Sequence, residues 1–265
     1  MAAAVAVAVR GYVGTERGRE SLSIGAGGDR TAMVDRVAED AVLSACARLA
    51  GDGARFLLRS EEAGDRAFGA AQPVLLVDPV DGSINAKQGL PYHCTSLALV
   101  DGTTFGDLAV GVVRNLAGDG VFSAVRGGGV LLDGAPMQPL DVALQNGRIP
   151  VLLLEAAAQP ARVVEQVELL RHAGRLRLMG AAALSLCQVA RGAATALVST
   201  GGMRSFDCAA GLLVLRESGA VVTDANGDDV MDVPADFSSR VRLVASRNAE
   251  VHQTVLSLLN RSNVA

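Results

Sequence analysis

The spacing of apolar and polar residues changes along the chain, and each change predicts an element. Apolar side chains in residues 31–49 recur at helical spacing, which predicts a helix with Thr31 as its N-cap. Short apolar runs then predict strands of a buried sheet at residues 56–58, 74–77, 95–100 and 111–113. Between residues 121 and 136, closely spaced glycines predict a hairpin that connects further strands.

The second half of the chain alternates strand patterns with helix patterns. The predicted strands cover residues 149–155, 175–179, 194–199, 220–223 and 241–245. The predicted helices cover residues 161–173, 182–191 and 207–218. This alternation is typical of a layered α/β architecture. The change of pattern predicts an N-terminal α+β half over residues 1–145 and a C-terminal α/β half over residues 146–265.

Composition narrows the classes of protein. The 265 residues are half apolar, contain no Trp and carry a formal net charge of −4, with Arg scattered along the chain. We therefore expect no nucleic-acid partner. The four cysteines form no close pair, which favours reduced thiols in the cytoplasm. The apolar residues 1–10 predict a first helix rather than a signal peptide, and no apolar run is long enough to span a membrane.

The stretch DPVDGS suggests where chemistry takes place. Asp78 ends an apolar strand, and a turn at Pro79 brings Asp81 back toward the same point. Two carboxylates placed in this way can share a hard cation such as Mg²⁺. The backbone N–H groups of Gly82 and Ser83 can turn toward an anion. A plain β-turn is the alternative, because Asp, Pro and Gly are common turn residues.

Two further carboxylates strengthen the hypothesis of a metal site. Glu61 follows a predicted strand, and Asp207 stands at the start of an apolar helix. An Asp in that position is often only a cap. A helix N-terminus is also a favourable anion site, so a metal ion held there can in turn hold a phosphate group. The three histidines are too dispersed for a zinc site.

The motifs SEE, DPVDGSIN, SFDCAAG and GLLVLRESGAVVTDANG, in this order, resemble the inositol monophosphatase family of Mg²⁺-dependent, lithium-sensitive phosphatases. The resemblance covers residues 25–247. DPVDGSINAKQGLPYHCTSLAL and GAGGDRTAMVDRVAED are similar to the archaeal branch that hydrolyses both inositol phosphate and fructose 1,6-bisphosphate. The resemblance implies a layered αβαβα sandwich of the sugar phosphatase type, a homodimer and a small phosphorylated metabolite as substrate.

The resemblance also implies metal ligands. Glu61 would bind a first ion, with Asp78 bridging two ions and the backbone carbonyl of Val80 completing the first site. Asp81 and Asp207 would hold the second ion together with Asp78. The family implies two to three Mg²⁺ ions, with Mn²⁺ as a substitute.

Catalytic and substrate residues follow from the same motifs. Asp35 and Ser83, which stands where most members have Thr, would orient the water that attacks phosphorus, and Glu61 completes the expected catalytic group. The expected substrate contacts are Gly82, Ser83, Ala182, Arg204 and Asp207. Two interpretations of Arg204 are open: it contacts a second phosphate or a sugar hydroxyl of the substrate, or it is a solvated surface residue.

Two departures from the family pattern leave the substrate open. Ala181 replaces a serine hydroxyl near the leaving group, and residues 199–202 lack an acidic residue that relatives use to bind substrate hydroxyls. The main hypothesis is a Mg²⁺-dependent phosphomonoesterase for small polyol or sugar phosphates. The alternatives are a fructose-1,6-bisphosphatase, a 3′-phosphonucleotide phosphatase and a catalytically idle metal-dependent binding or regulatory member.

Overall fold

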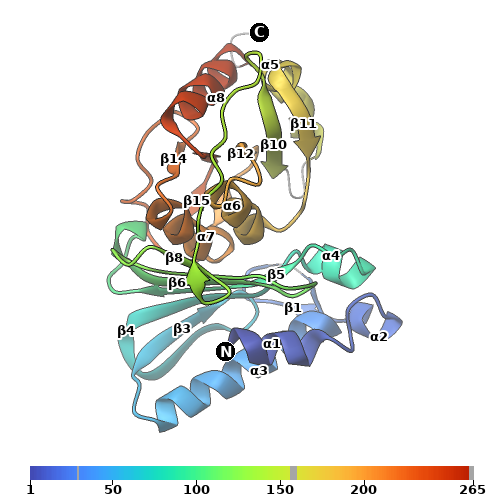
Figure 1. The fold of residues 1–265 in the computed structure, drawn as a ribbon. Coiled ribbons are helices and arrows are strands. Elements are labelled where there is room, and N and C mark those ends of the chain that lie inside the picture. Colours follow the sequence, from blue (N-terminus) through green and yellow to red (C-terminus); the bar gives the residue numbers. More distant parts are fainter. Residues whose placement is uncertain (29, 156–159, 263–265) are drawn as a thin grey trace.

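The computed structural model describes residues 1–28, 30–155 and 160–262, and its helices and sheets alternate in layers (Figure 1). The elements of the first half are α1 (Ala2–Val9), α2 (Glu16–Arg19), β1 (Ser21–Ile24), β2 (Arg30–Ala32), α3 (Met33–Gly51), β3 (Phe56–Ser60), β4 (Gly64–Asp81), α4 (Ser83–Gln88), β5 (Cys94–Val100), β6 (Leu108–Asn115), β7 (Val121–Val125), β8 (Val130–Leu132) and β9 (Ala135–Pro136). A single 3-10 turn covers Phe105–Asp107.

The second half contains β10 (Ile149–Glu155), a 3-10 segment (Pro160–Gln166), α5 (Val167–His172), β11 (Ala173–Arg177), α6 (Ala182–Ala190), β12 (Ala196–Ser199), β13 (Met203–Arg204), α7 (Ser205–Glu217), β14 (Val221–Asp224), β15 (Arg240–Val241), β16 (Leu243–Ser246) and α8 (Ala249–Ser262).

Two sheets carry the fold. The first has seven strands in the order β3-β4-β5-β6-β7-β8-β9, and neighbours from β4 to β9 pair antiparallel. The second has five strands in the order β11-β10-β12-β16-β14, with β10 parallel to both of its neighbours. Parallel strands end at the same edge of a sheet, so the carboxyl ends of β10 and β12 lie side by side.

Three apolar clusters hold the layers together. Helices α1 and α3 pack on the outer face of the seven-stranded sheet, α6 and α7 lie between the two sheets, and α5 and α8 cover the five-stranded sheet (Figure 1). The middle cluster is the largest, because both α6 and α7 bury most of their side chains there. The predicted layered α+β fold is confirmed. Within the described residues, no helix has the length and apolar character needed to cross a membrane.

Several local predictions were wrong. Thr31 is not the N-cap of α3: it lies in β2, and its hydroxyl donates a hydrogen bond to Glu62. The backbone N–H of Ala32, at the actual start of α3, donates to the Asp35 carboxylate at 2.8 Å. The helix predicted over residues 161–173 is α-helical only from Val167, after a 3-10 segment. The periodicity analysis did not predict α4 or α8.

Candidate active site

Glu61 and Asp78 meet because two neighbouring strands end together. β3 pairs with the last part of β4 so that Ser60 lies opposite Val77. The Glu61 backbone N–H then donates to the Val77 carbonyl at 3.1 Å. Both carboxylates therefore leave the sheet at the same edge, and both are buried.

Asp207 joins them through the start of α7. Asp78 pairs in register with Ser96 of β5, and the Ser96 hydroxyl donates to the Phe206 carbonyl at 3.2 Å. This contact holds the first turn of α7 against the strand beside Asp78. Carboxylate oxygens of Glu61, Asp78 and Asp207 lie within 4.8 Å of one another, a spacing that could hold a metal ion.

The environment of the three carboxylates disfavours their charged forms. Burial is the main cause that raises the pKa of Glu61 to about 8, that of Asp78 well above its ordinary value and that of Asp207 above its ordinary value. Repulsion between the neighbouring carboxylates raises the pKa values of Glu61 and Asp78 further. A divalent cation would relieve this repulsion, and oxygen ligands of this kind suit Mg²⁺. The residues therefore fit the metal that the sequence predicts.

Arg204 is already a partner of two of these carboxylates. Its Nη2 lies 2.7 Å from Glu61 Oε1, and its Nε lies 3.1 Å from Asp207 Oδ2. The guanidinium also lies over the Phe206 ring, 4.7 Å from the ring centroid. With only 20% of its side chain exposed, Arg204 is not the solvated surface residue that the sequence left as an alternative.

Asp81 contacts the start of α6. Its two carboxylate oxygens accept hydrogen bonds from the backbone N–H groups of Ala182 at 3.0 Å and Ala183 at 2.7 Å. Asp81 therefore caps the N-terminus of α6. Cys94 also donates its thiol to Asp81 at 3.4 Å. Burial, followed by repulsion from Asp207, raises the pKa of Asp81 to about 7. Asp81 lies outside the group of three carboxylates that meet within 4.8 Å.

The turn after Asp81 requires glycine. Gly82 has φ +87°, and a Cβ at this position would lie 2.9 Å from the Gly180 carbonyl oxygen. Ser83 then begins α4 and donates its hydroxyl to the Val80 carbonyl at 3.2 Å. The Val80 N–H in turn donates to Asp78 at 3.0 Å. The stretch is thus a turn in geometry that also orders Asp78.

Asp35 lies on α3 with a partner that the sequence analysis missed. Its Oδ2 lies 3.0 Å from Lys87 Nζ, in an ion pair with side chains only 3% and 16% exposed. Its Oδ1 is buried and has no hydrogen-bond partner among the described residues. Lys87 comes from α4 and is the second residue after the DPVDGSIN motif, and this position was the available signal for it.

Glu155 is a second missed residue. It is buried at the carboxyl end of β10 and accepts the Ser185 hydroxyl at 2.6 Å. Burial is the main cause that raises the pKa of Glu155 to about 7. An acidic residue at the end of an apolar strand is the same pattern that identified Asp78, so the signal was present in the sequence.

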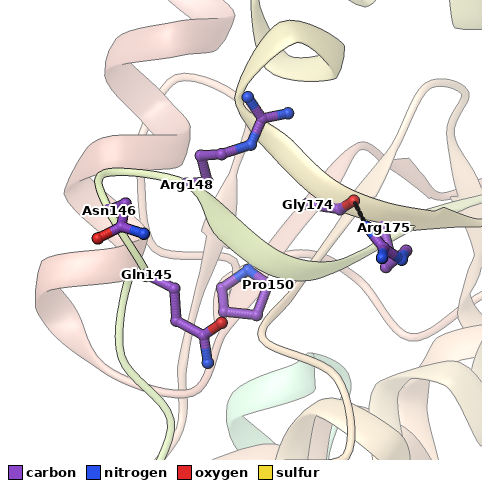
Figure 2. A pocket seen from close by; sticks show the side chains of 6 residues that line it. All are labelled: Gln145, Asn146, Arg148, Pro150, Gly174 and Arg175. Atoms are coloured by element: carbon purple, nitrogen blue, oxygen red, sulfur yellow. Dashed lines mark hydrogen bonds between the residues drawn. The ribbon is translucent and has the colours of Figure 1, made fainter.

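A polar pocket of about 510 Å³ lies elsewhere (Figure 2). It is lined by Gln145, Asn146, Arg148, Pro150, Gly174 and Arg175. Pro150 is the second residue of β10 and Glu155 is its last, which separates the pocket from Glu155 by about 16 Å along the strand. The guanidinium groups of Arg148 and Arg175 donate to backbone carbonyls of Ala173 and Gly174. This pocket is not part of the carboxylate site.

Fold and site together define the class of protein: a layered α+β protein whose buried carboxylates could hold a divalent metal ion beside a helix N-terminus suited to an anion. The chain belongs to the inositol monophosphatase family, whose sequence model matches residues 1–263. The predicted family is therefore confirmed.

Individual relatives carry phosphatase names. A fructose-1,6-bisphosphatase/inositol-1-monophosphatase of Methanothermobacter thermautotrophicus is 30% identical over 98% of this chain and 94% of the relative. An inositol-1-monophosphatase of Mesorhizobium japonicum is 32% identical over 80% of this chain and 78% of the relative. A bifunctional NADP phosphatase/NAD kinase of Methanococcus maripaludis is 28% identical over 94% of this chain. The match covers 46% of that relative, so the chain spans about half its length.

Solved structures support the same fold. The extragenic suppressor protein suhB of Bartonella henselae superposes with a TM-score of 0.83 at 24% identity, covering 98% of this chain and 95% of that one. A Pyrococcus horikoshii protein, described as having similarities to inositol-1 monophosphatase, gives a TM-score of 0.76 at 27% identity over 95% and 92% of the two chains.

Proposed function

We propose that this chain is a Mg²⁺-dependent phosphomonoesterase that hydrolyses small polyol or sugar phosphates. The observation that carries the proposal is the meeting of Glu61, Asp78 and Asp207 at the N-terminus of α7. Carboxylates there suit a divalent cation, and the helix terminus suits the phosphate that the cation would also contact. Membership of the family and the phosphatase names of the relatives support the same reaction.

The proposed metal ligands are the carboxylates of Glu61, Asp78, Asp81 and Asp207 and the backbone carbonyl of Val80, with two to three Mg²⁺ ions bound and Mn²⁺ as a substitute. A bound divalent cation would lower the pKa of a water molecule that it holds and would neutralise charge on the phosphate oxygens. Asp81 lies outside the group of three carboxylates that meet within 4.8 Å, although its oxygens keep lone pairs for an ion beside their contacts with α6. We therefore rank it below the three clustered carboxylates.

The remaining residues position water and substrate. We propose that Asp35, held by Lys87, orients the attacking water together with the hydroxyl of Ser83. The backbone N–H groups of Gly82 and Ser83 and the first turn of α7 would receive phosphate oxygens. Ala182 would line the leaving-group side. Arg204, once released from Glu61, would bind a second phosphate or a sugar hydroxyl.

The relatives suggest particular substrates. Their names include inositol-1-monophosphatase, fructose-1,6-bisphosphatase and NADP phosphatase. We propose inositol 1-phosphate and fructose 1,6-bisphosphate first, and the 2′-phosphate of NADP as a further candidate. We also propose a cytoplasmic homodimer and a division of each chain into residues 1–145 and 146–265, as the sequence suggests.

Phosphate release from these three substrates, measured with and without Mg²⁺, tests the proposal. Wild type should release phosphate only with Mg²⁺, and Asp78→Asn should abolish release because Asp78 is one of the three carboxylates that meet within 4.8 Å. Asp119→Asn, which changes an exposed loop carboxylate, is the matched control and should behave as wild type. Equal release from wild type and Asp78→Asn would contradict the proposal. Mg²⁺ binding without release of phosphate would favour the idle binding member.

A further inference from the structure

We propose that Glu155 accepts a hydrogen bond from a hydroxyl of the substrate's leaving group, and so selects phosphate esters of polyols over esters of alcohols without further hydroxyls. The inference rests on the proposed function and names the residue that sets its substrate preference. Glu155 of β10 and Asp81 of β4 both lie next to the start of α6.

The start of α6 holds both carboxylates. The backbone N–H groups of Ala182 and Ala183 donate to Asp81 at 3.0 and 2.7 Å, and the Gly180 N–H, two residues earlier, is near enough to Glu155 to lower the pKa of its carboxyl. The short segment from residue 180 to residue 183 thus lies beside both side chains. The negative charges of Glu155 and Asp81 are close enough for Glu155 to raise the pKa of Asp81.

The order of strands in the five-stranded sheet also places Glu155 near the other carboxylates. Glu155 pairs with Ser199 at the end of the parallel strand β12, and the Thr200 N–H donates to the Glu155 carbonyl at 3.0 Å. From there the chain continues to Arg204 and Asp207. Figure 1 shows the β10 arrow ending toward α6 and α7. Glu155 therefore stands at the edge of the five-stranded sheet that faces the carboxylate site.

Glu155 is held rigidly but is not fully enclosed. Its Oε1 accepts the Ser185 hydroxyl at 2.6 Å, and the Ser185 hydroxyl lies 3.3 Å from that of Tyr92. The residue keeps 8% of its surface exposed. A carboxylate fixed in this way is a preorganised acceptor, and it loses little conformational freedom when a substrate hydroxyl binds.

The hydrogen bonds that a carboxylate can accept determine which alcohols it favours. Hydrogen bonds to a charged acceptor are about twice as strong as neutral ones. A site built to bind a hydroxyl discriminates against an analogue that lacks it, because a buried polar group is left without its partner. An alcohol with several hydroxyls satisfies Glu155, whereas an aromatic alcohol with none does not.

The test compares two esters, inositol 1-phosphate and p-nitrophenyl phosphate, in wild type and Glu155→Gln. The variant keeps the volume of the side chain and removes its charge. We expect the ratio of kcat/KM for inositol 1-phosphate to kcat/KM for p-nitrophenyl phosphate to fall about tenfold, as one charge-assisted hydrogen bond would require. Glu165→Gln, an exposed neighbour on the 3-10 segment, is the matched control and should leave the ratio unchanged.

An equal fall for both esters, or no fall, would overturn the inference, because a merely structural role affects both substrates alike. A wild type that hydrolyses neither ester would instead contradict the proposed function. Calorimetric binding of both esters in the presence of Ca²⁺ then decides the inference separately. A tenfold loss of affinity confined to inositol 1-phosphate in Glu155→Gln supports it, and equal affinities overturn it.

Discussion

Arg204 Nη2 lies 2.7 Å from Glu61 Oε1 and joins the two ends of the carboxylate group, because its Nε also contacts Asp207. The guanidinium supplies positive charge at the place where a metal ion is expected. It is further held against the Phe206 ring. A cation that binds both Glu61 and Asp207 would therefore compete with this arginine for their carboxylate oxygens.

Arg204→Gln should bind Mg²⁺ about fivefold more tightly than wild type. This factor corresponds to about 1 kcal/mol for the loss of a competing ion pair. The same variant should be less stable without metal, because Glu61 and Asp207 lose their counter-charge. Calorimetric titration with Mg²⁺ and melting temperatures in a chelator measure the two effects. Arg171→Gln, which breaks an exposed pair with Glu168, is the control. Weaker Mg²⁺ binding by Arg204→Gln would show that the arginine assists the ion instead of competing with it.

Asp78→Asn should stabilise the protein in a chelator by about 1–3 kcal/mol, because it removes one buried charge from a group of repelling carboxylates. It should also abolish the rise in melting temperature that Mg²⁺ gives the wild type, since that rise requires metal binding to the folded state. Thermal unfolding with chelator and with Mg²⁺ provides both measurements. A variant that melts below wild type in chelator would contradict the account of repulsion.

Glu39→Gln should change how stability depends on pH. Burial raises the pKa of Glu39 from 4.5 to about 7, against the hydrogen bond donated by Ser60. Between these two pH values the unfolded chain loses a proton that the folded protein keeps, so wild-type stability falls as pH rises through this window. The variant should lack this fall and be more stable at pH 8 by at most about 3 kcal/mol.

Chemical unfolding at pH 4 and pH 8 measures this difference. At pH 4 the carboxyl of Glu39 is mostly protonated in both states, so Glu39→Gln should be close to wild type in stability there. Parallel stability curves for the two proteins across the whole range would show that burial of Glu39 carries no such cost.

Lys87→Gln should lower kcat about tenfold with a smaller change in KM, because Lys87 holds Asp35 in position for the attacking water. It should also destabilise the fold by about 1–3 kcal/mol, since the buried Asp35 loses its ion-pair partner. Lys87→Arg should restore most of both losses, and Gln88→Ala, at an exposed neighbouring position, is the control. A fall in stability without any change in kcat would restrict Lys87 to a structural role.

Local signals predicted much of the candidate site. Asp78, Glu61 and Asp207 follow strand ends or open a helix, and the structure brings these three together. The same signal pointed to Asp81, but the amides of α6 compete for its carboxylate. That competition depends on a helix 101 residues later in the chain, so the local pattern did not reveal it.

Helix boundaries were predicted less well for a related reason. Thr31 has the chemistry of an N-cap, yet its hydroxyl donates to Glu62, two residues after the end of β3, and the helix begins two residues after Thr31. The α4 helix is too short to show a period, and α8 was not predicted although it buries one face against the five-stranded sheet. Tertiary contacts override weak local preferences in such segments.

The sequence by itself determined the family, the layered arrangement of the elements and the identity of the clustered carboxylates, because these depend on residue types and periods along the chain. Only the tertiary structure decided their partners: Arg204 with Glu61, Lys87 with Asp35, Asp81 with α6, and Glu155 beside it. Ion pairs and hydrogen bonds act over a few ångströms in space. Their partners are therefore set by how the layers pack and not by how far apart residues stand in the chain.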